Sequence, residues 1–129
     1  MKHPLVFATA LFGSTVPALA AEPVLTPEHQ ASLRCSAVFA LVAADQAHGR
    51  AAALAFPALG LRGKEFFVRT AARVMDEAGA DRAQLRTILS RDAVGLRQEM
   101  ARGTPLRQVI EPCLGLLDLT VPPGAGRTP

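Results

Sequence analysis

Two cysteines, Cys35 and Cys113, are the feature that most restricts how this chain can fold. An even number of cysteines in an exported protein is expected to be oxidised, which here means one disulfide. In the chain-entropy treatment, closing a loop of about 79 residues stabilises a protein by roughly 4.5 kcal/mol as an upper figure. That is large beside the ~5–15 kcal/mol that holds an ordinary domain together. The sequence therefore predicts that the segments carrying Cys35 and Cys113 lie side by side.

Export is predicted from the first twenty residues. Lys2 precedes an apolar run, and the triplet Ala18-Leu19-Ala20 then places a small residue at both positions that a signal peptidase recognises. We expect residues 1–20 to be a signal peptide that is removed before Ala21, which gives a periplasmic or secreted protein. The apolar run is broken by polar residues and Pro17 and is too short to cross ~30 Å of hydrocarbon, so we expect no membrane anchor after cleavage.

Glycine and proline divide the remaining chain into four segments with helical periodicity. The first begins at Thr26-Pro27, a hydroxyl cap followed by proline at the first helical position, and ends at Gly49. The second covers 64–78, the third covers 82–102, and the fourth opens at Thr104-Pro105. No segment shows the alternation expected of a strand. This pattern predicts an all-α fold, a small four-helix bundle-like domain over 21–119 whose disulfide joins the first and last helices.

Three details sharpen this expectation. Residues 33–44 are apolar on nearly all sides of the first helix, which is typical of a central helix. Gly95 inside the third helix predicts close packing against a neighbour, and Pro112 predicts either a kink or a new short helix in the fourth segment. Residues 120–129 are predicted to form a flexible tail rich in proline and glycine. The predicted core consists of Leu33, Phe39, Leu41, Phe67, Val74, Leu85, Leu89, Leu96 and Leu114.

The sequence gives little sign of catalysis, cofactor binding or nucleic-acid binding. The formal net charge is only +3, and the chain has no Tyr or Trp on which bases could stack, so we expect no nucleic-acid partner. His29 and His48 lie at opposite ends of one predicted helix, about 28 Å apart by helical rise, so we expect no metal site. The sequence has neither a C-x-x-C-H haem motif nor a G-x-S-x-G nucleophile motif, and we assign no catalytic residue and no cofactor.

The strongest candidate for a partner surface is the apolar connection 50–63 with the residues that follow it. Loops are normally polar, so this segment either folds over the core or contacts a protein, a peptide or a lipid. Three arginines nearby could instead hold an anionic ligand. The candidate surface residues are Leu54, Phe56, Pro57, Leu59, Leu61 and Phe66, and the candidate anion contacts are Arg62, Arg69 and Arg73.

The segments LRCSAVFALVAADQ, GLRGKEFFVRTAARVMDEAG and EPCLGLLDLTVPP together resemble small, exported, two-cysteine helical proteins of proteobacterial type that have no assigned activity. The resemblance covers most of the chain after residue 20, implies the helical fold and export, and brings no site residue with it.

Two hypotheses for function follow. The leading one is a non-enzymatic periplasmic interaction or chaperone-like module that uses an apolar surface. The alternative is a small-ligand carrier or an enzyme whose site is assembled only in the fold. A flat apolar surface would favour the first, and a deep pocket lined by polar groups would favour the second.

Overall fold

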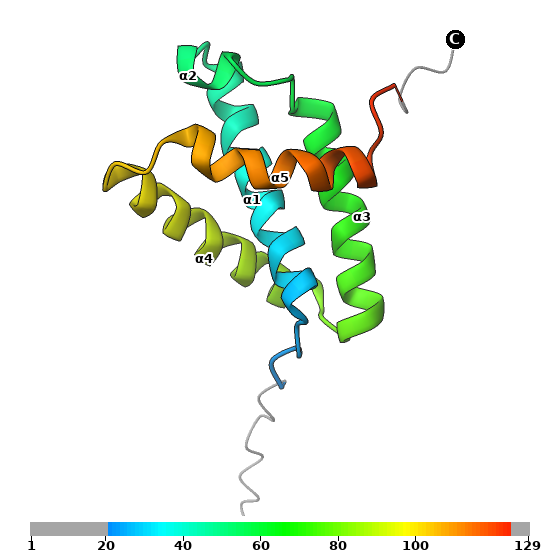
Figure 1. Cartoon of the computed structure of the whole chain (residues 1–129). Helices are drawn as coiled ribbons and strands as arrows, with labels where there is room; N and C mark the ends of the chain where they lie inside the picture. Colours follow the sequence, from blue (N-terminus) through cyan, green and yellow to red (C-terminus); the bar gives the residue numbers. More distant parts are fainter. Residues whose placement is uncertain (1–20, 125–129) are drawn as a thin grey trace, which may run out of the picture.

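The computed structural model describes residues 21–124, which form five helices and contain no strand (Figure 1). The helices are α1 (Pro27–Ala47), α2 (Ala51–Leu54), α3 (Gly60–Ala78), α4 (Arg82–Ala101) and α5 (Leu106–Thr120). The predicted all-α fold is therefore confirmed, with the short helix α2 in addition to the four predicted segments. The predicted signal peptide, 1–20, and the last five residues of the predicted tail lie outside the described range.

Helix α1 is the centre of the structure, because it contacts each of the other four helices. It begins with a capping box, in which the Thr26 hydroxyl accepts from the backbone N–H of His29 and the His29 ring accepts from the backbone N–H of Thr26. Helices α3 and α4 flank α1, and α5 crosses over α1 and α3 (Figure 1). Helices α3 and α4 are joined by a short turn at Gly79 but make few contacts with each other.

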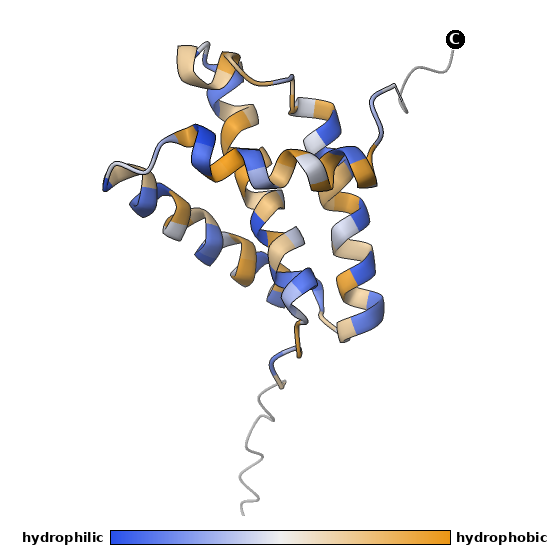
Figure 2. Ribbon diagram, in the orientation of Figure 1, coloured by the Kyte–Doolittle hydropathy of each residue, from blue (hydrophilic) through white to orange (hydrophobic). Residues whose placement is uncertain are grey.

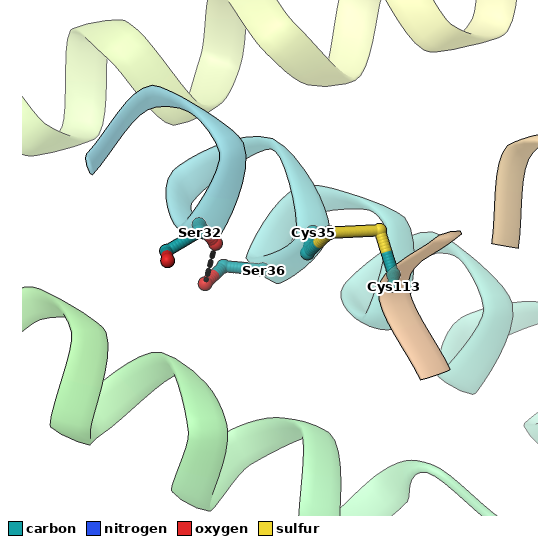
Figure 3. Close-up of a disulfide and its surroundings, with 4 residues drawn as sticks. All are labelled: Ser32, Cys35, Ser36 and Cys113. Atoms are coloured by element: carbon teal, nitrogen blue, oxygen red, sulfur yellow. Dashed lines mark hydrogen bonds between the residues drawn. A yellow bond between two sulfur atoms is a disulfide. The ribbon is translucent and has the colours of Figure 1, made fainter. Parts of the chain in front are cut away.

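The disulfide joins α1 to α5, as predicted (Figure 3). The Cα atoms of Cys35 and Cys113 are 5.3 Å apart, within the usual range for a bridge, and both residues are buried. On α5, Ile110 and Leu117 flank Cys113 at helical spacing and are also fully buried. The disulfide therefore lies within the contact between the first and last helices and closes the fold there.

The core consists of two clusters, whereas the sequence predicts one. The larger cluster surrounds the disulfide and contains Phe39, whose ring packs edge-to-face on Phe66. The smaller cluster, around Leu33 and Val74, lies near the turn between α3 and α4. Figure 2 shows hydrophobic and hydrophilic residues alternating along α3 and α4, so only one stripe of each helix contributes to these clusters. Four predicted core residues are only half-buried: Leu41, Phe67, Leu89 and Leu114.

The close helix–helix contact that was predicted at Gly95 is found at Gly63 instead. Close packing was predicted at Gly95, but a Cβ atom there would meet nothing within 4 Å. The close approach is instead at Gly63, where a Cβ atom would lie 3.0 Å from the Cβ atom of Phe39. Gly60 and Gly63 were predicted to precede the second helix, whereas α3 begins at Gly60. A glycine at position 63 of α3 lets α1 approach this closely, because a larger residue would place its Cβ atom against Phe39.

The last helix differs from the prediction in where it starts and where it ends. Helix α5 is continuous through Pro112, with Pro105 rather than Thr104 at the N-cap. It ends at Thr120, and Val121 is buried in the larger cluster. The prediction that the flexible tail starts at residue 120 is therefore wrong for Thr120 and Val121, which anchor the end of α5.

Candidate functional site

The predicted apolar surface at residues 50–63 and Phe66 is divided between the core and the solvent. Leu59 and Phe66 are fully buried, so the expectation that they face a partner is wrong. Phe56 is half-buried, and the guanidinium of Arg107 lies 5.6 Å from its ring centroid. Leu54, Pro57 and Leu61 are exposed, but nothing gathers them into one hollow.

The side chain of Gln46 explains why this apolar connection folds inward. Its amide nitrogen lies 2.9 Å from the carbonyl oxygen of Pro57 and 3.1 Å from that of Ala53, and donates to both. Its amide oxygen accepts from the backbone N–H of Leu59 at 3.0 Å. One side chain on α1 thus satisfies the backbone groups that the connection would otherwise expose, which lets Leu59 enter the core.

The arginines proposed as anion contacts have partners within the chain. The Arg62 guanidinium donates to the Asp118 carboxylate at 2.7 Å and to the carbonyl oxygen of Val121. Arg69 donates to the carbonyl oxygen of Thr120 at 3.0 Å. These arginines of α3 therefore satisfy carbonyls at the C-terminal end of α5, where the helix dipole also favours positive charge.

Arg73 is engaged at the other end of α3. It forms ion pairs with Glu28, at 2.8 Å, and with Glu77. Glu77 also accepts a hydrogen bond from the buried His29 ring at 2.7 Å. The bond from His29, followed by the charge of Arg73, holds the pKa of the Glu77 carboxyl below its usual value. This group of charges fastens the start of α1 to the end of α3.

The side chains that could serve as metal ligands do not gather. Within the described part of the chain, no three His, Cys, Asp or Glu residues lie close enough together to hold a metal ion. Over the same range, no helix is long and apolar enough to span a membrane.

The largest hollow, of about 1020 Å³, lies between residues 22–31 and α4. Its lining includes five charged residues, of which all but Glu22 have partners within the chain. Asp81 caps the start of α4, Arg34 pairs with Glu99 at 2.8 Å, and Arg91 pairs with Asp92. Most charged groups of this hollow are therefore engaged within the chain, as a helix cap or in ion pairs, which gives no support to a ligand site there.

The feature that the sequence did not reveal is a long groove between α3 and α4, which we call the α3/α4 groove. It consists of two hollows of about 820 Å³ and 450 Å³ that share Phe67, Leu89, Ala93 and Arg97. The groove exists because α3 and α4 both pack on α1, while their backbones stay apart and their side chains meet only in the smaller core cluster around Val74 and Leu85. Half-buried Phe67 and Leu89, both predicted as core residues, lie at its centre.

The walls of the α3/α4 groove are apolar in the middle and basic near the ends. Val68 on α3 and Val94 on α4 are 56% and 51% exposed, which is high for large apolar residues in helices. No carboxylate, imidazole or thiol lines the groove. The α3 wall comprises Gly60, Gly63, Lys64, Phe67, Val68, Ala71, Ala72 and Met75, and the α4 wall comprises Arg82, Leu85, Arg86, Leu89, Ser90, Ala93, Val94 and Arg97.

The floor of the smaller hollow, of about 450 Å³, is a strip of small residues on α1. Ala40 and Ala44 are exposed there, and Ala43 is half-buried. Ala40 follows Cys35 by five residues, which is about 140° around the helix axis. The floor therefore faces away from α5, and Ala40 and Ala44 are left exposed between α3 and α4.

Comparison with protein-family models, with curated proteins and with solved structures gives no significant match. The geometry of the α3/α4 groove is therefore the basis of the functional argument.

Proposed function

We propose that this protein is an exported, non-enzymatic interaction or chaperone-like module that holds an apolar segment of another protein in the α3/α4 groove. The observation that carries the proposal is the groove itself, an open trough with apolar walls contributed by Phe67, Val68, Leu89 and Val94. Exposed apolar surface gathered in one place marks interaction sites more often than isolated apolar residues do.

The chemistry of the groove favours binding over catalysis. Its hydroxyl groups are those of Ser36 and Ser90, and the Ser36 hydroxyl donates to the carbonyl oxygen of Ser32 at 2.9 Å (Figure 3). A nucleophilic hydroxyl needs a base within hydrogen-bonding reach, and no carboxylate or imidazole lines this groove. The groove is also open along its length, whereas sites that carry small molecules enclose most of the ligand surface.

Export is supported by the disulfide and by the character of residues 1–20. A buried bridge between Cys35 and Cys113 is stable in an oxidising compartment such as the periplasm or the extracellular space. Sequencing the N-terminus of protein recovered from that compartment tests this part, with Ala21 expected as the first residue. A start at Met1 would contradict export by cleavage.

Suppression of aggregation tests the interaction itself. Heat-unfolded malate dehydrogenase exposes apolar segments, and light scattering would follow its aggregation with and without the oxidised protein. We expect the protein to reduce scattering and Val94→Asp to remove the effect, because a carboxylate in the groove would have to be desolvated by the client. Leu119→Asp is the matched control, since Leu119 is 84% exposed on α5 and does not line the groove. Equal loss in the two variants, or no effect of the unsubstituted protein, would contradict the proposal.

A further inference from the structure

The positive charges of this protein fall into two groups. Within residues 21–124, seven arginines form ion pairs with carboxylates, at distances of 2.6–3.7 Å. Lys64, Arg82, Arg86 and Arg97 form no ion pair in this range, and all four line the α3/α4 groove. Arg102 is the remaining arginine of this range without an ion pair, and it lies outside the groove. Unpaired positive charge is thus concentrated around one apolar trough.

Two of these positive charges, Arg82 and Arg86, lie near the N-terminal end of α4, which is an unfavourable place for them. Arg82 and Arg86 are four residues apart, so two like charges occupy the same helix face. Arg82 also lies in the first turn of α4, where the helix dipole favours negative charge, and Arg86 follows directly after that turn. Neither has a carboxylate partner in the described structure that would offset this cost. A partner that brings carboxylates to the groove would supply the missing counter-charge.

We infer that the occupant of the α3/α4 groove is an amphipathic helix of a partner protein that carries acidic residues near both ends of its apolar stripe. The inference rests on the proposed function and specifies the chemistry of the partner. The apolar stripe would contact Phe67, Leu89 and the exposed valines. The flanking carboxylates would reach Lys64 and Arg97 at one end and the pair on α4 at the other.

A helix fits this groove better than an extended peptide does. The walls and floor are helices whose backbone hydrogen bonds are internal, so they offer no edge to pair with an extended backbone. An extended peptide in an apolar trough would therefore leave its own N–H and C=O groups unpaired, whereas a helix satisfies them itself. The groove stripe of α4, from Arg82 to Arg97, spans about 22 Å, which matches a helix of ~15 residues.

Helix α5 shows within this structure how such a contact is made. It has 15 residues, and its buried Ile110, Cys113 and Leu117 cover the side of α1 turned away from the groove floor. A bound helix on the floor would cover the exposed strip of α1 between α3 and α4, where Ala40 and Ala44 allow a close approach.

Charge and shape disfavour two other occupants. A second copy of the chain docked groove to groove would bring the basic residues of both copies together. A membrane surface is broad and flat, whereas the apolar residues here line a trough between two helices and do not project from the surface.

Fluorescence anisotropy with labelled 15-residue peptides tests the inference on the purified, oxidised protein. One peptide has leucines at helical spacing flanked by glutamates, a second has lysines in place of the glutamates, and a third is a shuffled version of the first without helical periodicity. We expect the acidic helical peptide to bind at least about tenfold more tightly than the other two, with a Kd that rises with salt.

Two protein variants locate the contact. The double variant Arg82→Gln/Arg86→Gln should weaken binding of the acidic peptide about three- to tenfold, as expected for two exposed ion pairs. Arg102→Gln removes the unpaired charge outside the groove and should leave the Kd unchanged. Equal weakening by the two variants would show that only the overall charge matters and would overturn the inference.

The remaining outcomes separate this inference from the proposed function. Equal binding of the lysine or shuffled peptide, while suppression of aggregation still depends on Val94, would overturn the acidic helix and leave the interaction module standing. If the protein floats with phosphatidylglycerol vesicles but binds none of the peptides, its partner is an anionic membrane. That result would also overturn the inference of an acidic helix. A dimer in native mass spectrometry that Val94→Asp abolishes would identify a second copy, with the same consequence. Loss of both peptide binding and aggregation suppression would refute the two proposals together.

Discussion

Alanine at Gly63 and alanine at Gly95 should change stability in opposite directions, although both glycines lie inside helices. Replacing a glycine by alanine within a helix normally stabilises it by about 0.5–1 kcal/mol, because alanine loses less backbone entropy on folding. This gain is available at both positions. What differs is the space that the new methyl group would enter.

At Gly63 the methyl group would lie 3.0 Å from the Cβ atom of Phe39. Favourable carbon–carbon contacts are at about 3.5–4.0 Å, so α1 and α3 would have to move apart. Phe39 cannot yield easily, because it is fully buried and its ring packs against Phe66 at 5.1 Å. Overpacking of this kind costs about 1–3 kcal/mol, which exceeds the helix gain. We therefore expect Gly63→Ala to lower the free energy of unfolding by about 0.5–2 kcal/mol.

At Gly95 the methyl group would meet nothing within 4 Å, so the full gain of about 0.5–1 kcal/mol should be seen. Urea unfolding of the two oxidised variants, followed by circular dichroism at 222 nm, measures both changes. A general effect of alanine on helix stability would change both variants in the same direction, so opposite signs can only come from packing. Stabilisation by Gly63→Ala, or destabilisation by Gly95→Ala, would refute the packing described for α1, α3 and α4.

Three further predictions concern the disulfide, the core and the charges at the start of α1. Replacing both cysteines by alanine should lower the free energy of unfolding by up to about 4.5 kcal/mol and Tm by ~15–20 °C, measured by thermal unfolding; a loss under ~1 kcal/mol would contradict this. Leu96→Ala, at a fully buried site, should cost about 2–5 kcal/mol and half-buried Leu89→Ala about 1–2 kcal/mol; equal costs in denaturant unfolding would be inconsistent with the groove. The Glu77 carboxylate, with its pKa lowered mainly by the bond from His29, stabilises the fold above its ordinary pKa of 4.5, and this contribution is lost as pH falls through the lowered value. In Glu77→Gln, the free energy of unfolding should therefore decrease less steeply as the pH falls below about 4.5. An unchanged pH dependence in this range would show that the contact between His29 and Glu77 contributes nothing to stability.

Local signals in the sequence were sufficient for most of the fold. Thr26-Pro27 predicted the start of α1, and two cysteines sufficed for the contact between the first and last helices. Sequence reasoning failed where the meaning of a residue depended on which other helix packs against it. A glycine within a helix indicates that something approaches closely or that nothing does, and only the packing distinguishes Gly63 from Gly95.

The candidate site could not be predicted for a related reason. Periodicity shows which side of a helix is apolar, but not whether two apolar sides meet each other or leave a gap. Phe67 and Leu89 were assigned to the core on this basis, and the structure places them in a groove because α3 and α4 diverge. The arginines were misjudged in the other direction: Arg62 and Arg69 stood out in an apolar stretch, yet they satisfy the carbonyl groups that end α5.

One signal of the groove was nevertheless present in the sequence, in the composition of α1. A helix that is apolar on nearly all sides, as this one is from Leu33 to Ala44, needs cover on all sides if it is to be central. Helices α3, α4 and α5 cover most of this apolar segment, whereas Ala40 and Ala44 remain exposed at the floor of the groove. Alanine at these positions limits the cost of leaving that side in water, because a methyl group exposes little apolar surface, and it also lets a helix approach closely when one binds. A largely apolar central helix whose alanines stay exposed between two flanking helices is therefore what a chain would have if a further packing partner came from another protein.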